Sequence, residues 1–576
     1  MTGSARDVSV GVANPGTKPP EDVKGRVAGA NWRYLLPDLR LGHVLCVGVP
    51  SLTTLSSLAR FGDRVTILVE REAQARRSNL DAAERGLDNV DAISLVGLGS
   101  RPVAPLSIDV VLAGGTRTGR RLWSRPAVQA DLRRWLKREG LLYAEFESLH
   151  DAGYRALLEG FQREFRPLWL APSSGETRAA APLNDAKAIA HLMDQGIVRH
   201  SHAYRRPFRR RGPTSTQRRL LKRATTRFGA LVGGVELDLD RPPAYLRSLA
   251  RSAGLDVDDD RWGLLASGHY NQKKVLLFLF EGEAESPRYV VKMTRHHAYN
   301  ERLENEWRAL MLLNDKLMRE RLTVPQPAFF GVHNSVAVLG QTAITGTPFR
   351  RVSTGAADCP HALALLDGLV ELGATTTRRP DDSAKVVADL DGLLQQFFRI
   401  YQPPSRQRDF LTKQLDVIRY EGTGLTPVFA HGDAGTWNVL VTTEGGVALL
   451  DWEAFDDIGM PLWDLFYFMR SYMVLASRSS GTHDALKAFS RYGLGDGALS
   501  RLLADVTQRY CDVTGLARRL VEPLFYMCWV HRAIKESFRT APQKLRRAHY
   551  ARLVGLCIER RDAPGLDRIF STVPGG

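Results

Sequence analysis

Short apolar runs alternate with amphipathic stretches in the first quarter of the chain. The runs HVLCVGV, RVTILV, AISLV and IDVVLA are separated by segments whose apolar residues recur at helical spacing. Strands that alternate with helices are typical of a parallel sheet with crossover helices. The pattern therefore predicts an α/β, Rossmann-like domain, to which we assign residues 31–195.

A different pattern begins near Trp262. The stretch GLLASGHYNQKKVLLFLFEGEAESPRYVVKM contains two or three apolar segments separated by turn residues, which predicts antiparallel strands. The next stretch, NERLENEWRALMLLNDKL, has apolar residues at helical spacing, and much of the chain beyond it is helical in pattern. The second half is therefore expected to be α+β, with a first part at 236–345 and a second at 346–576.

Length and composition indicate a multidomain globular protein. A chain of 576 residues is too long for one hydrophobic core, and 44% hydrophobic with 25% charged residues is ordinary for globular domains. No apolar run is long enough to span a bilayer. The five scattered cysteines have no metal-ligand spacing and favour reduced thiols in the cytoplasm. Residues 1–30 lack a secretory signal and are interpreted as a disordered tail.

The formal charge of +16 is concentrated in part in one segment. Between Gln195 and Val235 there is no acidic residue, and arginine is abundant. We interpret residues 196–235 as a basic linker, which is either simply solvated or attracted to an anionic surface. No recognition-module signature accompanies it, so no specific nucleic-acid partner is predicted.

The stretch FAHGDAGTWNVLV, residues 429–441, interrupts a strand-forming pattern with polar residues. His431, Asp433 and Asn438 lie between two apolar segments, and the later stretch VALLDWEAF places Asp451 after another. Loop acids and an amide next to buried strands are costly unless they bind something. Carboxylate and amide oxygens suit a hard cation such as Mg²⁺.

These residues carry a family resemblance. Residues from about 262 to 570 resemble the aminoglycoside phosphotransferase and choline kinase-like family, which shares its fold with protein kinases. The family's H-G-D, four residues and asparagine match residues 431–438, its D-W-E matches the motif at Asp451, and a later D-L element matches GMPLWDL, which contains Asp464. The resemblance implies a bilobal protein-kinase-like phosphotransferase domain that uses ATP and Mg²⁺.

The resemblance also implies individual roles. Asp433 would be the catalytic base, His431 would brace the loop and Asp464 would tie it down. Asn438, which belongs to the catalytic loop, and Asp451 would be the metal ligands. The nucleotide would meet the remaining predicted residues, which are Gly268 in the phosphate lid, Lys292 on the phosphates, Glu306 as the partner of Lys292 with Glu304 as the competing assignment, and the hinge from Gln341 to Ile344.

The first half resembles class I S-adenosylmethionine-dependent methyltransferases across roughly residues 30–150. Glu70 stands where that family's ribose-binding carboxylate would be, and Asp109 begins the fourth strand as the family's aspartate does. The first turn, VGVPSLTTL, has Gly48 alone where two or three glycines are usual. A Rossmann-like scaffold without methyl transfer is therefore favoured over a bifunctional methyltransferase-kinase, which stays open.

We therefore expect a cytoplasmic, ATP- and Mg²⁺-dependent phosphotransferase that acts on a hydroxyl of a small molecule or glycan. Residues 461–576 hold 18 Arg and Lys but 10 Asp and Glu, a bias that argues against a polycationic aminoglycoside as the acceptor. The basic stretch KESFRTAPQKLRRAHYARL would suit an anionic acceptor or is a solvated helix. The alternative is a non-catalytic nucleotide-binding or scaffold protein.

Overall fold

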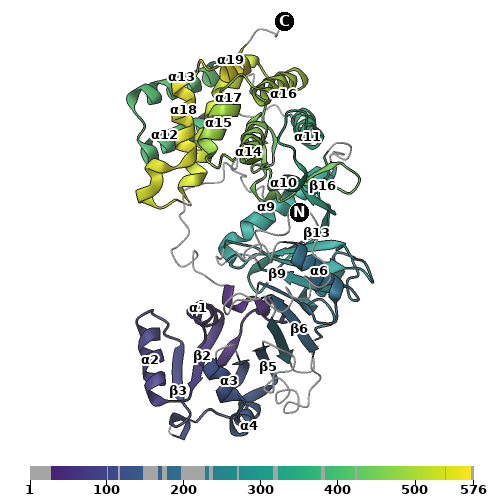
Figure 1. Cartoon of the computed structure of the whole chain (residues 1–576), viewed down its shortest axis with the longest axis vertical. Helices are drawn as coiled ribbons and strands as arrows, with labels where there is room; N and C mark the ends of the chain where they lie inside the picture. The colour runs from purple at the N-terminus through teal and green to yellow at the C-terminus, as the bar shows by residue number, and fades with distance from the viewer. Residues whose placement is uncertain are drawn as a thin grey trace, which may run out of the picture. The chain divides into compact units, whose positions relative to one another are not determined.

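The computed structural model divides into two compact units (Figure 1). The sheet unit holds the described residues of Pro19–Leu303 and Ala328–Ala343, and the helical unit holds those of Glu304–Pro327 and Ile344–Gly576. The structure describes residues 28–99, 102–113, 117–146, 166–171, 178–195, 227–232, 238–266, 268, 272–315, 322–377, 383–421, 425–479, 481–538 and 540–571.

The Rossmann-like half of the sheet unit contains parallel strands in the order β3-β2-β1-β4-β5. These strands are β1 (Gly42–Val47), β2 (Gly62–Val69), β3 (Val90–Ser94), β4 (Ile108–Ala113) and β5 (Leu136–Phe146). The intervening helices are α1 (Leu52–Phe61), α2 (Glu72–Ala83), α3 (Arg117–Trp123) and α4 (Pro126–Trp135). The strands β1, β2 and β4 are apolar and largely buried, as expected when helices cover both faces of a parallel sheet. The predicted parallel α/β sheet is confirmed.

The same sheet continues into the antiparallel strands that were predicted after Trp262. β8 (Arg227–Val232) runs antiparallel to β5 and to β6 (Arg166–Ala171), and β7 (Ala179–Pro182) pairs with both β6 and β9 (Arg261–Leu265). β10 (Val275–Phe280), β11 (Tyr289–Met293), β13 (Val336–Thr342) and β12 (Pro327–His333) follow. Among the described residues, 13 strands thus form one sheet.

One hydrophobic core extends under both halves of this sheet. Trp32 and Tyr34, in η2 (Ala28–Leu35), and Tyr245, in α8 (Ala244–Ser252), pack in the same cluster as residues of β1 and β10. The Tyr245 hydroxyl donates to the Tyr34 carbonyl at 2.8 Å, and the Tyr34 hydroxyl donates to the Thr294 carbonyl at 3.1 Å. The parallel and antiparallel halves are therefore joined by backbone pairing and by a shared core.

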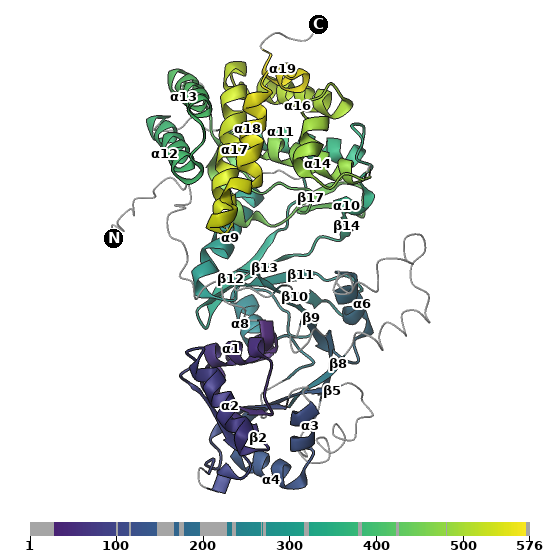
Figure 2. The same cartoon turned by 60° about the vertical axis from the view of Figure 1, so that its left-hand side comes forward.

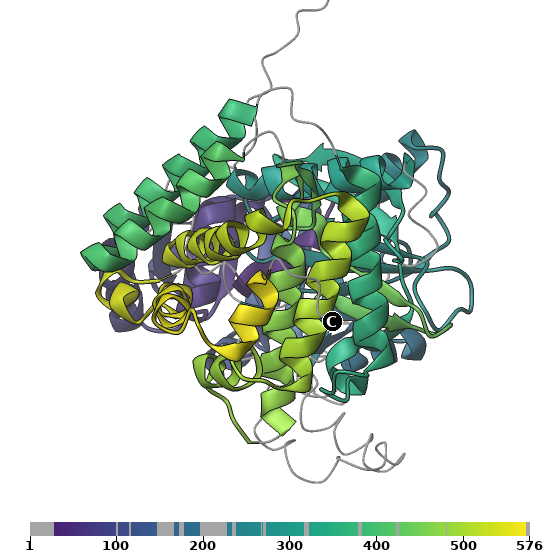
Figure 3. The ribbon, with the colours of Figure 1, turned by 90° about the horizontal axis from the view of Figure 1, so that it is seen from above.

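The helical unit is organised around α17 (Val521–Ser537). This helix buries 12 of its 17 side chains, and a helix that is apolar nearly all round belongs in the interior. α18 (His549–Glu559) lies beside it in Figure 2, and Figure 3 shows α12 (Ser383–Tyr401) and α13 (Ser405–Tyr420) side by side. The other helices are α9 (Asn300–Asp315), α10 (Phe349–Val352), α11 (Pro360–Thr376), α14 (Trp463–Ser479), α15 (Ala485–Tyr492), α16 (Ala498–Thr514) and α19 (Pro564–Phe570).

Two small sheets in the helical unit carry the interrupted motif. β15 (Val428–Ala430) pairs with β18 (Asp456–Gly459), and β16 (Val439–Thr442) lies between β14 (Gly346–Pro348) and β17 (Val447–Leu449). Residues 431–438 therefore form the connection from one sheet to the other, as the sequence pattern predicts.

Some predictions fall wholly or largely outside the described residues. These are the tail at 1–30, of which 1–27 are not described, and the basic linker at 196–235, of which Arg227–Val232 form β8. Within the described part of the chain, no helix is both long and apolar enough to cross a membrane. All five cysteines are buried and unpaired.

Candidate active site

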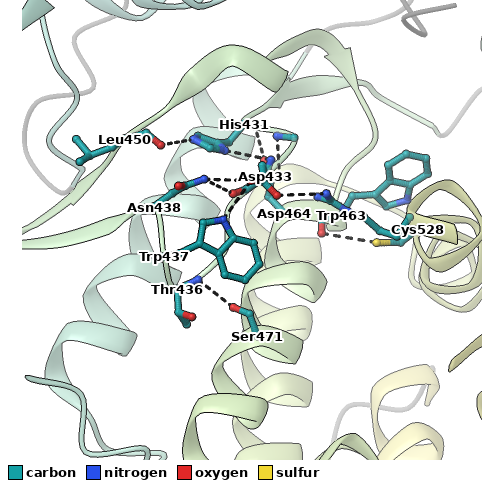
Figure 4. A network of polar contacts seen from close by, with 12 residues as sticks. His431, Asp433, Thr436, Trp437, Asn438, Leu450, Trp463, Asp464, Ser471 and Cys528 are labelled. Carbon is teal, nitrogen blue, oxygen red and sulfur yellow. Dashed lines mark hydrogen bonds and ion pairs between the residues drawn. The ribbon is translucent and has the colours of Figure 1, made fainter. Parts of the chain in front are cut away.

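The loop from His431 to Asn438 is fastened to α14 at two points (Figure 4). The carboxylate of Asp464, in the first turn of α14, accepts the backbone N–H of His431 and, at 3.0 Å, that of Gly432. The backbone N–H of Thr436 donates to the Ser471 hydroxyl at 3.0 Å. Asp464 thus ties down the loop, as predicted.

Glycine is required at position 432. Gly432 has φ +73°, and a Cβ atom there would lie 2.0 Å from the carbonyl oxygen of Ala454. The left-handed backbone and the close approach both exclude a side chain. The glycine of the H-G-D motif is therefore explained by the fit of this loop against the segment after Asp451.

His431 uses both ring nitrogens within the fold. Its Nδ1 accepts the backbone N–H of Asp433 at 3.1 Å, and its Nε2 lies 3.0 Å from the Leu450 carbonyl, which only accepts. These partners assign the proton to Nε2 and make the imidazole neutral. The ring is fully buried and meets Trp452 edge-on at 4.5 Å. Hydrogen bonds and packing of the His431 ring thus hold the loop in place.

The carboxylate of Asp433 accepts hydrogen bonds from two neighbouring side chains. Oδ2 accepts from Trp437 Nε1 and from Asn438 Nδ2, each at 3.2 Å, and Asn438 Nδ2 also lies 2.9 Å from the Asp433 carbonyl (Figure 4). The side chain of Asp433 remains 35% exposed. The carboxylate is therefore oriented while it still faces the surroundings.

Arg532 of α17 completes the surroundings of Asp433. Its Nη1 lies 3.6 Å from Asp433 Oδ1, and its guanidinium carbon lies 3.4 Å from the centroid of the Tyr467 ring. The side chain of Arg532 is 8% exposed, so the ion pair and the cation–π contact both act with little water nearby. Trp437 meets Tyr467 edge-on at 5.7 Å.

Neither Arg532 nor Trp437 is predicted from the sequence pattern. A signal existed for Arg532, because it is a charged residue within the apolar helix VEPLFYMCWVHRAIKES.

Asn438 and Asp451 stand at the same end of a hairpin. β16 and β17 pair with Val439 opposite Leu449, and the Leu450 N–H donates to the Asn438 carbonyl at 2.8 Å. Asp451 is the next residue along the chain. Because the side-chain amide nitrogen of Asn438 points at Asp433, the amide oxygen of Asn438 points away from Asp433.

Asp451 has a strained backbone. Its φ of +71° and ψ of 60° are left-handed, a conformation that costs a non-glycine residue about 1 kcal/mol or more. The following N–H, of Trp452, donates to Glu306 Oε1 at 3.3 Å, and Trp452 is fully buried. Strain of this kind is typical of functional sites.

Of the two glutamates proposed as the partner of Lys292, Glu306 is fully buried on α9 and Glu304 is exposed. Burial favours Glu306.

Three predicted nucleotide contacts belong to the sheet unit. Lys292 is buried in β11 opposite Leu276 and Leu339, and Gln341 is buried in β13. Gly268 has φ +78°, and its carbonyl accepts from Arg295 at 3.0 Å. His431, Asp433, Asn438, Asp451, Glu306 and Ile344 belong to the helical unit. A common nucleotide site formed by the two sets stays a prediction.

The acidic residues of the Rossmann-like half are engaged differently. Glu70 forms an ion pair with Arg125. Asp109 accepts the backbone N–H of His43 at 2.8 Å and the ammonium of Lys137 at 2.7 Å. Both predicted positions thus have basic partners within their own domain.

Hydrogen bonds within the Rossmann-like half also hold the turn after β1. Gly48, with φ +86°, donates its N–H to the Leu68 carbonyl at 2.8 Å. The Ser51 hydroxyl caps α1 by accepting the Thr54 N–H at 3.2 Å.

A cavity of about 170 Å³ lies next to the catalytic loop in the helical unit. Its lining includes Gly432 and Arg532 together with Lys535 and His531 of α17 and Asp456 of β18. Burial, reinforced by the charge of Arg532, lowers the pKa of Lys535 from 10.5 to about 8. Burial also raises the pKa of Asp456 to about 6 and holds that of His531 well below 6.5.

Comparison with known proteins supports the resemblance of the second half. Residues 266–504 match the sequence model of the phosphotransferase enzyme family, APH. No curated protein matches the sequence. The aminoglycoside phosphotransferase APH(3'')-Id from Streptomyces rimosus, solved with ADP and streptomycin, is 15% identical over 50% of this chain and 97% of that chain, with a TM-score of 0.31.

Two further solved structures are also similar to this chain. A SAM-dependent methyltransferase from Aquifex aeolicus is 16% identical over 26% of this chain and 87% of that chain, with a TM-score of 0.20. A co-crystal structure of WbdD with the kinase inhibitor LY294002 is 12% identical over 82% of this chain and 84% of that chain, with a TM-score of 0.21.

Proposed function

We propose that this chain is an ATP- and magnesium-dependent phosphotransferase that moves the γ-phosphoryl group to a hydroxyl of a small molecule or glycan. The observation that carries the proposal is the arrangement of the loop, in which Trp437 and Asn438 hold one oxygen of Asp433 while the carboxylate stays partly exposed. Phosphoryl transfer depends mainly on positioning and on charge neutralisation, and this loop is built for positioning.

Asp433 would act as the base. Its carboxylate takes the proton of the acceptor hydroxyl as that oxygen bonds to the γ-phosphorus and ADP departs. His431 is unsuited to this step, since one ring nitrogen accepts the Asp433 N–H and the other faces a carbonyl. Its part is to hold the loop in register.

The donor set fits magnesium. Asn438 and Asp451 offer an amide oxygen and a carboxylate from the same end of the β16–β17 hairpin. No group of three or more His, Cys, Asp or Glu side chains in the described residues is arranged to hold a metal ion, so nucleotide phosphates and water would supply the other ligands. When bound, the ion would neutralise charge on the phosphates.

The nucleotide would contact both lobes of the kinase-like domain. Lys292 would meet the phosphates, with Glu306 as its partner, and Gly268 would belong to the lid above them. The adenine ring would meet backbone groups between Gln341 and Ile344. Lys292 and Glu306 support this assignment because each is a charged side chain that is buried in its own unit.

Calorimetric titration of ATP with Mg²⁺ into the wild type and Asp451→Ala tests the proposal. We expect binding to the wild type that depends on Mg²⁺ and is weakened about tenfold or more in the variant. Asp433→Ala is the matched control, because it removes the base and should retain nucleotide binding. A wild type that binds no ATP with Mg²⁺ would contradict the proposal and favour the scaffold alternative.

A further inference from the structure

A groove of about 740 Å³ lies on the helical unit, apart from the candidate active site. Its lining comes from the end of α12, the start of α13, the helices α15 and α18, and the short helix η10 (Pro542–Arg547). None of the described residues that line it also lines the cavity next to the catalytic loop. Its volume is in the range of small-molecule sites.

Three cationic side chains line this groove, and each belongs to a different element. They are Lys487 of α15, Arg546 of η10 and Arg552 of α18. All three are exposed, and none forms an ion pair with a residue that the structure describes. Their charges are therefore open to a ligand that enters the groove from solvent.

Carboxylates are fewer than cations around this groove. Among the described residues of its lining, Glu559 is the only acid. Asp484 lies outside the lining, and its carboxylate accepts the backbone N–H groups of Leu486 and Lys487 as the cap of α15. The charges of Lys487 and Arg552 also act on Asp484. Even with Asp484 included, three cations face two carboxylates, so the groove favours an anion.

A buried arginine adds positive charge next to the groove. Arg470 of α14 is 9% exposed and contacts the imidazole of His549, the first residue of α18. Its Nε has no hydrogen-bond partner in the described part of the chain. Burial, followed by the charges of Arg470 and Arg552, lowers the pKa of His549 to about 3. The imidazole is therefore neutral, and it offsets neither guanidinium.

The floor of the groove is apolar. It includes Phe397 and Tyr401 of α12, Leu486 of α15 and Leu556 of α18, whose side chains are buried or partly buried. The Tyr401 hydroxyl already donates to the Ala533 carbonyl at 2.7 Å, which leaves its ring to the groove. A ligand would thus meet apolar surface on the floor and exposed cations at the rim.

The basic stretch KESFRTAPQKLRRAHYARL supplies part of this rim. It contains the end of α17, η10 and the first turns of α18, so it is not one solvated helix. Residues 540–558 hold Lys544, Arg546, Arg547 and Arg552 but no acidic residue. Two of these four cations line the groove.

We propose that this groove binds a small organic phosphate, with the phosphoryl group on Lys487, Arg546 and Arg552 and the apolar part of the molecule on the floor. A guanidinium group presents paired N–H donors that match phosphate oxygens, which suits two arginines to this group. The ligand is bound and is not altered. The site is independent of the proposed function, because no residue of the catalytic loop takes part in it.

The concave shape favours a soluble ligand over a membrane. The apolar side chains lie at the floor, and the exposed cations lie above them. A small molecule reaches both, whereas a flat bilayer would meet the cations and leave the floor uncovered. We therefore assign the groove to a soluble phosphate ester rather than to a lipid head group.

Calorimetric titration of the full-length protein with phenyl phosphate tests the inference. We expect phenyl phosphate to bind the wild type, and to bind the double variant Arg546→Met/Arg552→Met about tenfold more weakly or worse. Inorganic phosphate, which lacks the ring, should bind less tightly than phenyl phosphate, and phenol, which lacks the charge, should not bind. Arg560→Met is the matched control, because Arg560 is an exposed arginine at the end of α18 outside the lining.

A gain in affinity provides a test that misfolding cannot imitate. Glu559→Gln removes the one carboxylate of the described lining, so it should tighten phenyl phosphate binding about twofold. Unchanged or weaker binding by this variant would contradict the proposed rim. Thermal unfolding of each variant checks that it is folded.

Three results would overturn the inference. The first is no binding of phenyl phosphate by the wild type, and the second is equal affinity in the wild type and the double variant. The third comes from sedimentation with vesicles of phosphatidylcholine and phosphatidic acid. Vesicle binding that needs Arg546 and Arg552, without binding of phenyl phosphate, would assign the groove to a lipid head group instead.

Discussion

Acidic residues stand at strand ends in both halves of the chain, yet their surroundings differ. Glu70 and Asp109 each form an ion pair with a basic side chain, Arg125 and Lys137. Asp433 has one oxygen held by two neutral N–H donors and the other 3.6 Å from Arg532. The carboxylates of Glu70 and Asp109 are thus taken up by ion pairs within the fold. Hydrogen bonds instead fix the orientation of the Asp433 carboxylate.

The difference shows that the position of an acid within a motif is a weak guide to its role. Glu70 and Arg125 are 42% and 46% exposed, which is the situation of an ordinary surface ion pair. The loop around Asp433 instead holds its carboxylate by hydrogen bonds from Trp437 and Asn438 while the side chain stays 35% exposed. The partners of a carboxylate distinguish the two regions better than residue type does.

The largest expected effect is that of Asp433→Asn on phosphoryl transfer. Loss of the base should lower kcat by about 10²–10⁴-fold, while ATP affinity with Mg²⁺ stays close to that of the wild type. ADP release with an accepted hydroxyl compound measures the first, and calorimetry the second. Glu70→Gln is the matched control and should leave kcat unchanged. Equal kcat values for Asp433→Asn and Glu70→Gln would mean that the two acidic residues do not differ in their contribution to catalysis.

Gly432→Ala should be strongly destabilising. The new Cβ would lie 2.0 Å from the Ala454 carbonyl oxygen, and φ is +73°, so we expect a loss of about 2–4 kcal/mol in the free energy of unfolding. Gly445→Ala is the control, because its φ is +87° but nothing lies within 4 Å. Chemical denaturation of both variants isolates the clash. Similar losses would assign the whole effect to backbone conformation.

Lys535→Met should stabilise the protein near neutral pH. The folded pKa of about 8 lies below the ordinary 10.5, so the unfolded chain binds this proton more tightly and wild-type stability rises from pH 8 to 10.5. We expect an unfolding midpoint roughly 2–4 °C higher for the variant at pH 7, as about 1 kcal/mol produces in a domain of 150–250 residues.

This advantage should shrink above pH 8. The charged groups that act on Lys535 are Arg532, which lowers its pKa, and Asp433, Asp456 and Asp464, which raise it. Thermal unfolding at pH 7, 8 and 9 measures the difference between wild type and variant. A difference that does not change with pH would mean that Lys535 does not titrate near 8.

The smallest expected effect is that of Glu70→Gln on stability. Because the pair with Arg125 is exposed, its loss should cost less than about 1 kcal/mol. Calorimetry of the wild type with S-adenosylmethionine should show no binding, since the carboxylate is already paired. Binding that is present in the wild type and lost in Glu70→Gln would support the bifunctional methyltransferase-kinase instead.

The local pattern of the chain predicted a large part of this fold. Alternation of strands and helices predicted β1 to β4. The antiparallel strands β9, β10 and β11 coincide with the apolar runs, and the interrupted loop begins where the run of β15 ends. Asp464 was predicted to tie down the loop, and its two backbone contacts agree. These features depend on short-range periodicity or on a motif of fixed spacing.

Contacts between distant parts of the chain were not predictable in the same way. β8 forms within a stretch interpreted as a linker, because its pairing partners β5 and β6 are far from it in sequence. Arg532 contacts Asp433 across nearly 100 residues of sequence. Its charge within a largely buried helix is a signal, but the sequence does not show which residue it contacts. Trp437 gave no signal, since its role depends on where the loop turns it.

The pairing of β7 with β9 has a practical consequence for dissecting this protein. Ala179 and Ala180 cover the backbone of Leu265 and Leu264, so β9 is an interior strand of the sheet. A fragment that begins at residue 236 to isolate the kinase-like half would expose β9 as a free edge, with unpaired N–H and C=O groups ready to join another chain. Such a fragment should self-associate, and expression from residue 28 onward should prevent this.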